Sequence, residues 1–330
     1  MKPDALDLRL IERLSDGQFH SGSALAAWIG ISRAAIWKHL RALESLGLEV
    51  PAVPGRGYRL LTPVEPLSES RLKEDLSPKS LALLQHLDLQ CVVDSTNAQL
   101  LRRAQAGGEA GSVCIAEYQS AGRGRVGRAW VSPYGANIYL SLLWRFQEPS
   151  QLGGLSLAVA VVALRALQAL GIQGIQLKWP NDLIFQGRKL GGILIELAGE
   201  AHGGCAAVVG IGLNRYVPKT MASAIDQPFI DLNSISGTAL PSRHRVLAAL
   251  IDRLLPMLKA YPETGLAPFL GEWRNQHAYD GSLCEVDMGG SVLAGRIEGI
   301  TAAGLLLIRD VKGHLREIAS GDVRVRVKAV

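Results

Sequence analysis

Residues 116–130 of the chain have the sequence AEYQSAGRGRVGRAW, and this stretch constrains the fold more than any other. Gly122, Gly124 and Gly127 have the G-x-G-x-x-G spacing of a dinucleotide-binding turn. Such a turn must open a helix, with an acidic residue about twenty positions further on. Instead, residues 130–135 read WVSPYG, which is not a helix start, and the chain contains no G-x-x-x-x-G-K-[ST] segment. The sequence therefore argues against a Rossmann fold and against a Walker phosphate loop.

The same stretch carries Arg123, Arg125 and Arg128 within six residues. Arginines this close repel one another unless an anion lies among them, and the planar guanidinium group suits phosphate and carboxylate. We therefore expect a loop that is mobile when empty and becomes ordered around an anionic ligand. A disordered basic loop, or a loop that contacts nucleic acid, is the alternative interpretation.

Four more motifs lie on either side of this loop. They are DSTN at 94–97, KWPND at 178–182, GRKLGGI at 187–193 and GIGLN at 210–214. Each one alone has an ordinary explanation as a helix cap, a proline-bounded turn or the end of a strand. The first groups short hydrogen-bonding side chains at the start of a predicted helix. Their joint presence beside the arginine-rich loop indicates a single binding site.

Bulk composition places the chain among globular proteins. Its 330 residues suggest two or three domains, and 48% hydrophobic with 20% charged residues is typical of a substantial core. A net charge of +5 is weak support for an anionic partner.

Cysteine usage and the lack of a targeting segment predict a soluble cytoplasmic protein with no membrane partner. The four cysteines are far apart in the sequence and form no C-x-x-C pair, which argues against a zinc site and a disulfide framework. Residues 1–13 carry charges and no apolar core of a signal peptide. The longest apolar run, 155–164, is half the length of a membrane span, so we expect a buried core helix there.

Residues 1–66 have the pattern of a winged helix-turn-helix domain. Leu6, Leu10 and Leu14 recur at helical spacing, and serine caps precede two further predicted helices, at 24–29 and 33–46. The glycine-centred turn between those two helices is typical of a helix-turn-helix. The sequence VPAVPGRGYRL at 50–60 predicts a hairpin, which would be the wing.

A set of polar and basic residues on this domain is expected to contact DNA. Arginine and lysine there could meet phosphates or guanine edges in a major groove. The alternative is an ordinary solvated helix face, and for the tryptophan of the set a packing role stays open. The predicted DNA-binding residues are Ser32, Arg33, Trp37, Lys38, Arg41 and Arg56.

The rest of the chain divides into two further predicted domains. Residues 62–66, TPVEP, cannot continue a helix and mark a linker. From 67 to 270 strand-like and helical segments alternate, as in an α+β or α/β catalytic core. From 271 to 330 short strands at 286–288, 292–297, 305–308 and 323–327 predict a small β-barrel or sandwich.

Together these motifs resemble those of bifunctional biotin–protein ligases that also repress biotin operons. The matching segments are DSTN, EYQSAGRGRVGRAW, SPYGANIYLS, KWPND, RKLGGILIE and GIGLN. The resemblance is close over 89–214 and looser at both ends. It implies an α+β architecture with an N-terminal winged helix-turn-helix, a mixed-sheet core of the biotin/lipoate ligase (class II synthetase-like) type and a C-terminal SH3-like small β-barrel. Val126 departs from the family pattern, because many members carry another arginine there, which puts the loop's retention of ligand in question.

The resemblance also implies an activity. Such enzymes use ATP, with Mg²⁺ on its phosphates, to convert biotin to biotinyl-5'-AMP, and then pass biotin to a lysine of the biotin carboxyl carrier protein of acetyl-CoA carboxylase. Biotinyl-5'-AMP then acts as corepressor, by favouring a homodimer that binds operator DNA. The base that accepts the proton of the acceptor lysine is not identified by the sequence.

The resemblance assigns three sets of residues to this chemistry. The catalytic set is Arg123, Arg125 and Lys178. The biotin-binding set is Ser95, Thr96, Asn97, Gln119, Gly122, Arg123, Gly124, Arg125, Lys178 and Gly192. The nucleotide-binding set is Arg125, Arg128, Trp130, Asn181, Asp182, Lys189 and Asn214. No side chain of the chain is expected to be a dedicated metal ligand.

Three alternatives stay open at this point. A lipoate–protein ligase shares the adenylate-then-lysine logic, although the arginine-rich loop and KWPND favour biotin. A transcription factor whose core binds ligand without catalysis is the second alternative. The third is a ligase whose winged helix no longer binds DNA.

Overall fold

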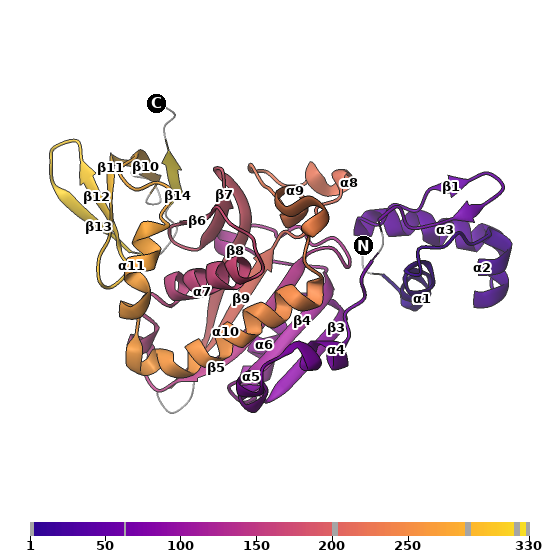
Figure 1. Ribbon diagram of the computed structural model, residues 1–330, viewed down its shortest axis with the longest axis horizontal. Helices are drawn as coiled ribbons and strands as arrows, with labels where there is room; N and C mark the ends of the chain where they lie inside the picture. The colour runs from indigo at the N-terminus through magenta and orange to yellow at the C-terminus, as the bar shows by residue number, and fades with distance from the viewer. Residues whose placement is uncertain (1–2, 63, 200–203, 288–291, 320–323, 328–330) are drawn as a thin grey trace.

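The computed structural model describes residues 3–62, 64–199, 204–287, 292–319 and 324–327. Figure 1 shows three parts in chain order: a helical N-terminal domain at the right, a central domain built on a large sheet, and a small C-terminal sheet at the upper left. Among the described residues, no helix has both the length and the apolar character needed to cross a membrane.

The N-terminal domain has the predicted winged helix-turn-helix order. Its elements are α1 (Ala5–Leu14), α2 (Gly22–Ile29), α3 (Arg33–Leu43), a 3₁₀ turn (Glu44–Leu46), and the wing strands β1 (Ala52–Val53) and β2 (Gly57–Tyr58). Ser21 and Ser32 cap α2 and α3 by accepting backbone N–H groups, as their positions predict. The third helix was predicted to run to residue 46. Its α-helical part ends at Leu43, and Glu44–Leu46 continue as a 3₁₀ turn that ends at Gly47, whose φ is 81°.

The central domain is a seven-stranded mixed sheet in the order β3-β4-β5-β9-β8-β7-β6. Only the β3–β4 pair is parallel among the described strands. The strands are β3 (His86–Val93), β4 (Ser112–Gln119), β5 (Ile138–Phe146), β6 (Ile175–Lys178), β7 (Asp182–Phe185), β8 (Arg188–Gly199) and β9 (Cys205–Leu213).

Helices cover both faces of this sheet, and the alternation of side chains along the strands explains why. Val113 of β4 packs in the large core formed with α7 and α10, whereas its neighbour Cys114 packs in a smaller core with Leu100 of α6. The helices are α4 (Glu69–Asp75), α5 (Pro78–Leu83), α6 (Thr96–Gln105), α7 (Leu155–Ala169), α8 (Lys219–Ala222), α9 (Leu232–Ser236), α10 (Arg243–Thr264) and α11 (Ala267–Asn275). The apolar run at 155–164 is a buried core helix, as predicted.

The C-terminal part is an antiparallel sheet in the order β13-β12-β11-β10-β14, which confirms the predicted small β domain. Its strands are β10 (Leu283–Asp287), β11 (Val292–Ile300), β12 (Leu306–Asp310), β13 (Leu315–Ile318) and β14 (Arg324–Val327). The strand β13 was not predicted, because its sequence LREI is short and half charged. Met288, the last residue of the strand predicted at 286–288, and Val323, the first residue of the strand predicted at 323–327, lie outside the described residues.

Polar contacts join the linker to the central domain. Arg243, at the start of α10 and fully buried, pairs with Glu117 of β4. The backbone N–H of Arg243 donates to the Glu65 carboxylate of the linker at 3.0 Å, and the ring of His244 also contacts that carboxylate. The linker is therefore fastened to the same buried ion pair that ties α10 to the sheet.

Candidate functional site

A cavity of about 240 Å³ opens between the N-terminus of α6, the arginine-rich loop and the ends of β6 to β9. The predicted residues that line it converge from four segments of the sequence. Those that line it are Ser95, Thr96, Asn97, Gln119, Arg123, Gly124, Arg125, Arg128, Trp130, Lys178, Asn181, Asp182, Lys189 and Gly192. Two predicted site residues do not line this cavity. Gly122 packs closely against Ser132 and Gln119, and Asn214 lines a smaller adjoining pocket of about 40 Å³.

One end of the cavity is a buried network of neutral hydrogen-bonding groups. The backbone N–H of Thr96 donates to Gln119 Oε1 at 2.9 Å, and Gln119 Nε2 donates to Ser132 Oγ at 3.3 Å. Thr96 and Gln119 are at most 9% exposed. The network arises because β3 ends where α6 begins, with Ser95 as the N-cap residue, so the DSTN side chains face the end of β4. Neutral donors and acceptors held in this way suit an uncharged polar ligand group.

Close approach of side chains explains both glycines of the GIG segment in β9. A Cβ atom on Gly212 would lie 2.6 Å from Cε2 of the Trp130 indole, and one on Gly210 would overlap the amide of Asn97. These two glycines let the Trp130 and Asn97 side chains lie directly on the strand. The indole Nε1 of Trp130 is buried and has no hydrogen-bond partner among the described residues, so it can donate to a ligand.

The arginine-rich loop folds back on itself over the cavity. The Gly124 N–H donates to the Arg128 carbonyl at 2.7 Å, and the Trp130 N–H donates to the Gly122 carbonyl at 2.9 Å. The Arg125 guanidinium reaches Asn181 Oδ1 at 3.4 Å across the cavity. The loop therefore brings guanidinium groups to the polar cavity without the long helix that a dinucleotide-binding turn needs.

Cations dominate the other end of the cavity. Lys189 Nζ lies 2.8 Å from Asp182 Oδ1 and 5.9 Å from the centre of the Trp130 ring. Burial lowers the pKa of Lys178, and the nearby charges of Lys189 and Arg128 lower it further, against the opposing effect of Asp182. A lysine in such surroundings gains most from an anionic ligand, because that ligand removes the repulsion among the cations.

The lining of this cavity does not suit a metal held by the protein alone. Asp182 is the only carboxylate among the described residues that line it, and that group is already paired with Lys189. Mg²⁺ prefers one or two carboxylates together with substrate phosphates. Any Mg²⁺ would therefore enter mainly as part of a nucleotide substrate.

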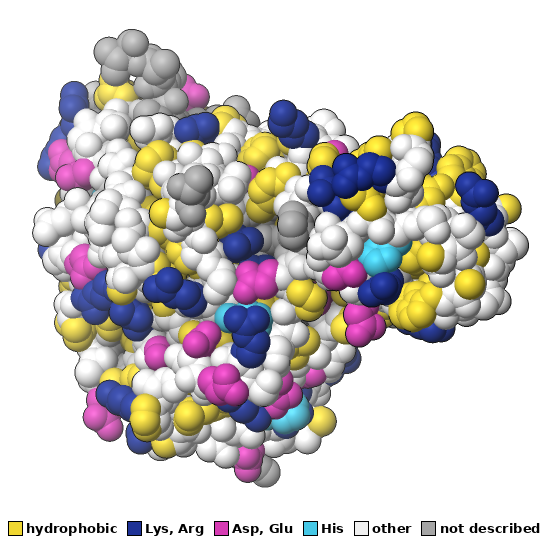
Figure 2. Space-filling model, turned by 45° about the vertical axis from the view of Figure 1, so that its right-hand side comes forward, with side chains coloured by type: hydrophobic (Ala, Val, Ile, Leu, Met, Phe, Trp, Pro, Cys, Tyr) yellow, Lys and Arg dark blue, Asp and Glu magenta, His cyan; other side chains and the backbone are white. Residues whose placement is uncertain are grey.

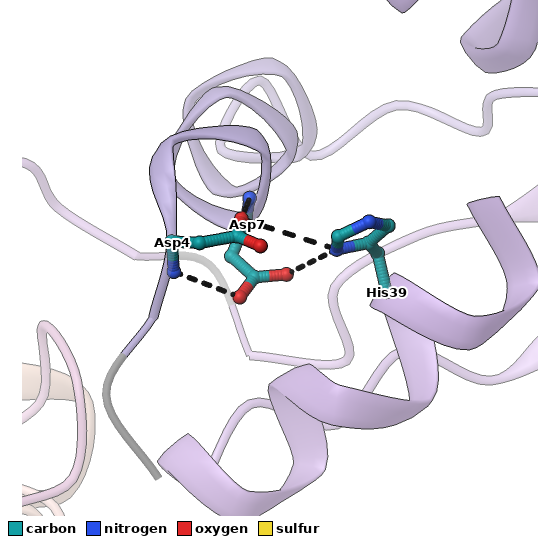
Figure 3. A group of neighbouring side chains, drawn as sticks. All are labelled: Asp4, Asp7 and His39. Carbon is teal, nitrogen blue, oxygen red and sulfur yellow. Dashed lines mark hydrogen bonds and ion pairs between the residues drawn. The ribbon is translucent and has the colours of Figure 1, made fainter. Parts of the chain in front are cut away.

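In the N-terminal domain, Asp4, Asp7 and His39 lie close enough together to bind a metal ion (Figure 3). Their hydrogen bonds explain the cluster without a metal. Asp4 caps α1 by accepting the backbone N–H groups of Leu6 and Asp7, and the Asp4 N–H donates back to Asp7. His39 Nδ1 lies 2.8 Å from Asp7 Oδ1, which ties α3 to α1. The cluster is thus a capping box with one cross-helix contact.

The residues predicted to contact DNA lie on the exposed surface of α3 and the wing. Trp37 is 56% exposed, so it is not a core residue, and the Arg41 guanidinium lies 5.9 Å from its ring centre. The guanidinium groups of Arg56 and Arg59 both stack on the Phe19 ring, at 4.0 and 4.6 Å. Figure 2 shows Lys and Arg side chains interspersed with hydrophobic ones on this lobe. Arg33 and Lys38 are exposed as well, whereas the Ser32 hydroxyl caps α3.

Several residues of the site were not predicted from the sequence. Gln227 and Tyr139 line the cavity, and Glu196 contacts both Asn97 and Arg123 at its edge. Gln227 lies in a segment without any motif. The other two were inside matched segments, but an alternating strand pattern does not say which polar residue points at a cavity.

Three family models match the chain. Family models match at residues 89–214 (Biotin/lipoate A/B protein ligase family), 7–59 (HTH domain) and 281–326 (Biotin protein ligase C terminal domain). The chain is 39% identical over 329 residues to the bifunctional ligase/repressor BirA of Escherichia coli, covering 99% of both chains. It is 30% identical to the bifunctional ligase/repressor BirA of Bacillus subtilis, covering 96% of this chain and 97% of that one.

A solved structure resembles about three quarters of the chain. The biotin protein ligase of Aquifex aeolicus, in complex with biotin and ATP, matches with a TM-score of 0.64 and 28% identity, over 74% of this chain and all of that one. Similarity along nearly the full length, with both the ligase and the helix-turn-helix models matched, leaves one assignment: the chain belongs to the family of bifunctional biotin ligases and repressors.

Proposed function

We propose that this chain activates biotin with ATP and transfers it to a lysine of the biotin carboxyl carrier protein. In the first step a biotin carboxylate oxygen attacks the α-phosphorus of ATP, the bond to the β-phosphate breaks, and pyrophosphate leaves. In the second step the lysine amine attacks the acyl carbon of biotinyl-5'-AMP and AMP leaves. The observation that supports this most is the single cavity that combines a neutral polar end with a cluster of cations.

The neutral end suits the ring system of biotin, whose cyclic urea has N–H donors and a carbonyl acceptor. Thr96 and Gln119 supply buried groups of matching kind. The cationic end suits the reacting anions. Arg123, Arg125 and Lys178 neutralise the carboxylate and α-phosphate as they approach, which is the main demand of this step because no protein nucleophile is needed.

In this proposal the nucleotide lies beside Trp130, on the side away from the Thr96 and Gln119 groups that bind biotin. The indole offers an apolar wall and an N–H that has no partner among the described residues, and Arg128 and Lys189 add positive charge beside it. Asn214 lines the adjoining pocket that also contacts Trp130. Mg²⁺ would accompany the ATP phosphates and help to neutralise them, and Asp182 is the one carboxylate among the described residues of the lining.

Biotin-dependent exchange of labelled pyrophosphate into ATP tests the first step, with lipoate and no acid as controls. We expect exchange with biotin alone. Exchange with lipoate would assign the chain to the other branch of the family. If no acid supports exchange, the core binds ligand without catalysis.

A second function is carried by the exposed basic surface of α3 and the wing. We expect the chain to bind operator DNA upstream of biotin genes, with Arg33, Lys38 and Arg56 near the phosphates or base edges. A mobility-shift assay with that DNA tests this. Lys38→Ala should weaken binding and reduce its salt dependence, because each phosphate contact releases counterions. Retention of full affinity and salt dependence in Lys38→Ala would remove this residue from the interface.

The two functions are linked in the proposal by biotinyl-5'-AMP as corepressor. Its anionic phosphate orders the arginine-rich loop and favours a homodimer, and two winged domains then bind a two-fold operator. Analytical ultracentrifugation with and without biotinyl-5'-AMP tests this step. A mass that doubles with ligand supports it, and identical masses contradict it.

A further inference from the structure

Ser141 of β5 has a fully buried hydroxyl between two residues of the DSTN motif. Ser141 Oγ lies 2.7 Å from Thr96 Oγ1 and 2.6 Å from Asn97 Oδ1, and Ser141 itself is 0% exposed. Both distances are those of an O–H···O hydrogen bond, so each contact needs a hydrogen between its two oxygens. The serine hydroxyl supplies only one.

The amide of Asn97 decides where that hydrogen lies. Asn97 Nδ2 donates to the Leu194 carbonyl at 3.1 Å and to Glu196 Oε2 at 2.8 Å, and both partners are acceptors only. The opposite orientation of the amide would place its oxygen against two other oxygens. Asn97 Oδ1 therefore faces Ser141, and because an amide oxygen cannot donate, the Ser141 hydrogen must point to it.

The direction of the next hydrogen bond follows. Since Ser141 donates to Asn97, the hydrogen between Ser141 and Thr96 must come from the Thr96 hydroxyl. Gln119 Oε1, which accepts the Thr96 backbone N–H at 2.9 Å, is a second oxygen near that hydroxyl, but it lies 3.2 Å away. The 2.7 Å contact with Ser141 is shorter, and without the Thr96 hydrogen it would bring two oxygens together with no hydrogen between them. The Thr96 hydroxyl thus directs its hydrogen to Ser141. Towards a ligand in the cavity that Thr96 lines, this hydroxyl can only accept a hydrogen.

We propose that Ser141 is a specificity-determining residue that, by accepting the Thr96 hydrogen, makes this edge of the cavity select a ligand N–H. This inference rests on the proposed function, in which that N–H belongs to the cyclic urea of biotin. An analogue with oxygen in place of that N–H brings a second acceptor against the Thr96 oxygen. The fixed hydrogen-bond direction, rather than the size of the cavity, then rejects it.

The test compares biotin with the two cyclic carbamate analogues in which one or the other ureido N–H is replaced by oxygen. Pyrophosphate exchange gives kcat/KM for each acid with the full chain and with Ser141→Ala. We expect Ser141→Ala to raise the KM for biotin about tenfold, the usual effect of losing one buried hydrogen bond, and to leave the KM for ATP unchanged. The preference for biotin over one carbamate should fall by about tenfold, because the freed Thr96 hydroxyl can then donate to the ring oxygen.

Matched variants separate this role from a loss of packing. Ser112 is an equally buried serine on the neighbouring strand β4, and it donates to the Glu109 carbonyl outside the cavity. Ser112→Ala should leave the preference for biotin unchanged. Ser141→Cys, with a weaker hydrogen-bonding group of similar shape, should fall between the full chain and Ser141→Ala, and it replaces that variant if Ser141→Ala does not fold. In a Thr96→Val background the Ser141 substitution should have no further effect on the preference.

The outcomes are decisive in both directions. A lowered preference in Ser141→Ala that disappears in the Thr96→Val background supports the inference. An unchanged preference, a rise in the KM for ATP equal to that for biotin, or additive effects of the two substitutions would overturn it while the proposed function stands. Absence of biotin-dependent exchange in the unsubstituted chain would overturn the proposed function itself, and the inference with it.

Discussion

Lys178 ends β6 among other cations, and burial lowers its pKa. Burial and the neighbouring cations oppose this charge more than Asp182 stabilises it, so it is available for the anions that meet in the transition state. We predict that Lys178→Ala slows formation of biotinyl-5'-AMP by about 10²–10³-fold, measured in a single turnover. The exposed Lys79 provides the control, since Lys79→Ala should react at the normal rate. An unchanged rate in Lys178→Ala would remove this residue from the mechanism.

His277 gives a pH dependence of stability with a defined sign. Burial lowers its pKa to about 4, with the Asp280 charge acting in the opposite direction, and its Nδ1 has no partner among the described residues. The unfolded chain takes up this proton near pH 6.5, so between pH 6.5 and 4 it binds more protons than the folded chain. The stability contributed by neutral His277 is therefore complete above pH 6.5 and is lost as the pH falls towards 4.

The substitution His277→Phe tests this dependence while keeping a ring against Trp273, whose centre lies 4.6 Å away. We predict that the free energy of unfolding of the unsubstituted chain falls by up to about 3 kcal/mol more than that of the variant between pH 6.5 and 4. Urea titrations at several pH values measure the difference. If the free energies of unfolding of the two proteins change in parallel with pH, the His277 ring is protonated to the same extent in the folded and unfolded chains.

At the scale of single elements, side chains that pack directly on β9 require glycine at two of its positions, Gly210 and Gly212. Gly212→Ala places a Cβ atom 2.6 Å from the Trp130 indole, so the ring must move away from the strand. We predict that this variant raises the KM for ATP at least about tenfold, with a smaller effect on the KM for biotin. Gly199→Ala, at the end of β8, is the control, because in the described part of the chain nothing lies within 4 Å of a Cβ atom placed on Gly199. Equal changes in both KM values would place Trp130 elsewhere in the mechanism.

The elements predicted from the sequence are those marked by a local motif, such as a helix cap or a glycine turn. The start of α6 followed from DSTN, α2 and α3 from their serine caps, and the wing from its glycines. The residues that sequence alone could not place are those that depend on strand register. Ser141 becomes part of the cavity network only because β5 lies between β4 and β9, opposite the start of α6. No spacing along the sequence contains that information.

For the whole molecule, the sequence predicted three domains but not how the first joins the second. The linker was expected only because TPVEP cannot continue a helix. In the structure its Glu65 carboxylate accepts the Arg243 backbone N–H and contacts His244 and Arg215. Arg243 and His244 lie 178 and 179 residues further along the chain than Glu65. The charges of these residues do not by themselves indicate such a pairing.

Glu65 therefore offers a test of how firmly the winged domain is held. Removing its carboxylate leaves the Arg243 N–H without its partner and weakens the link between the linker and α10. We predict that Glu65→Ala makes limited proteolysis of the 60–68 segment about tenfold faster, because local opening becomes easier. Pyrophosphate exchange should be unchanged, since Glu65 does not line the cavity. Glu69→Ala is the matched control, because that exposed carboxylate pairs only with Lys73 among the described residues. If both variants are cleaved at the rate of the unsubstituted chain, the buried Arg243–Glu117 pair and the apolar contacts of the linker hold the domain without help from Glu65.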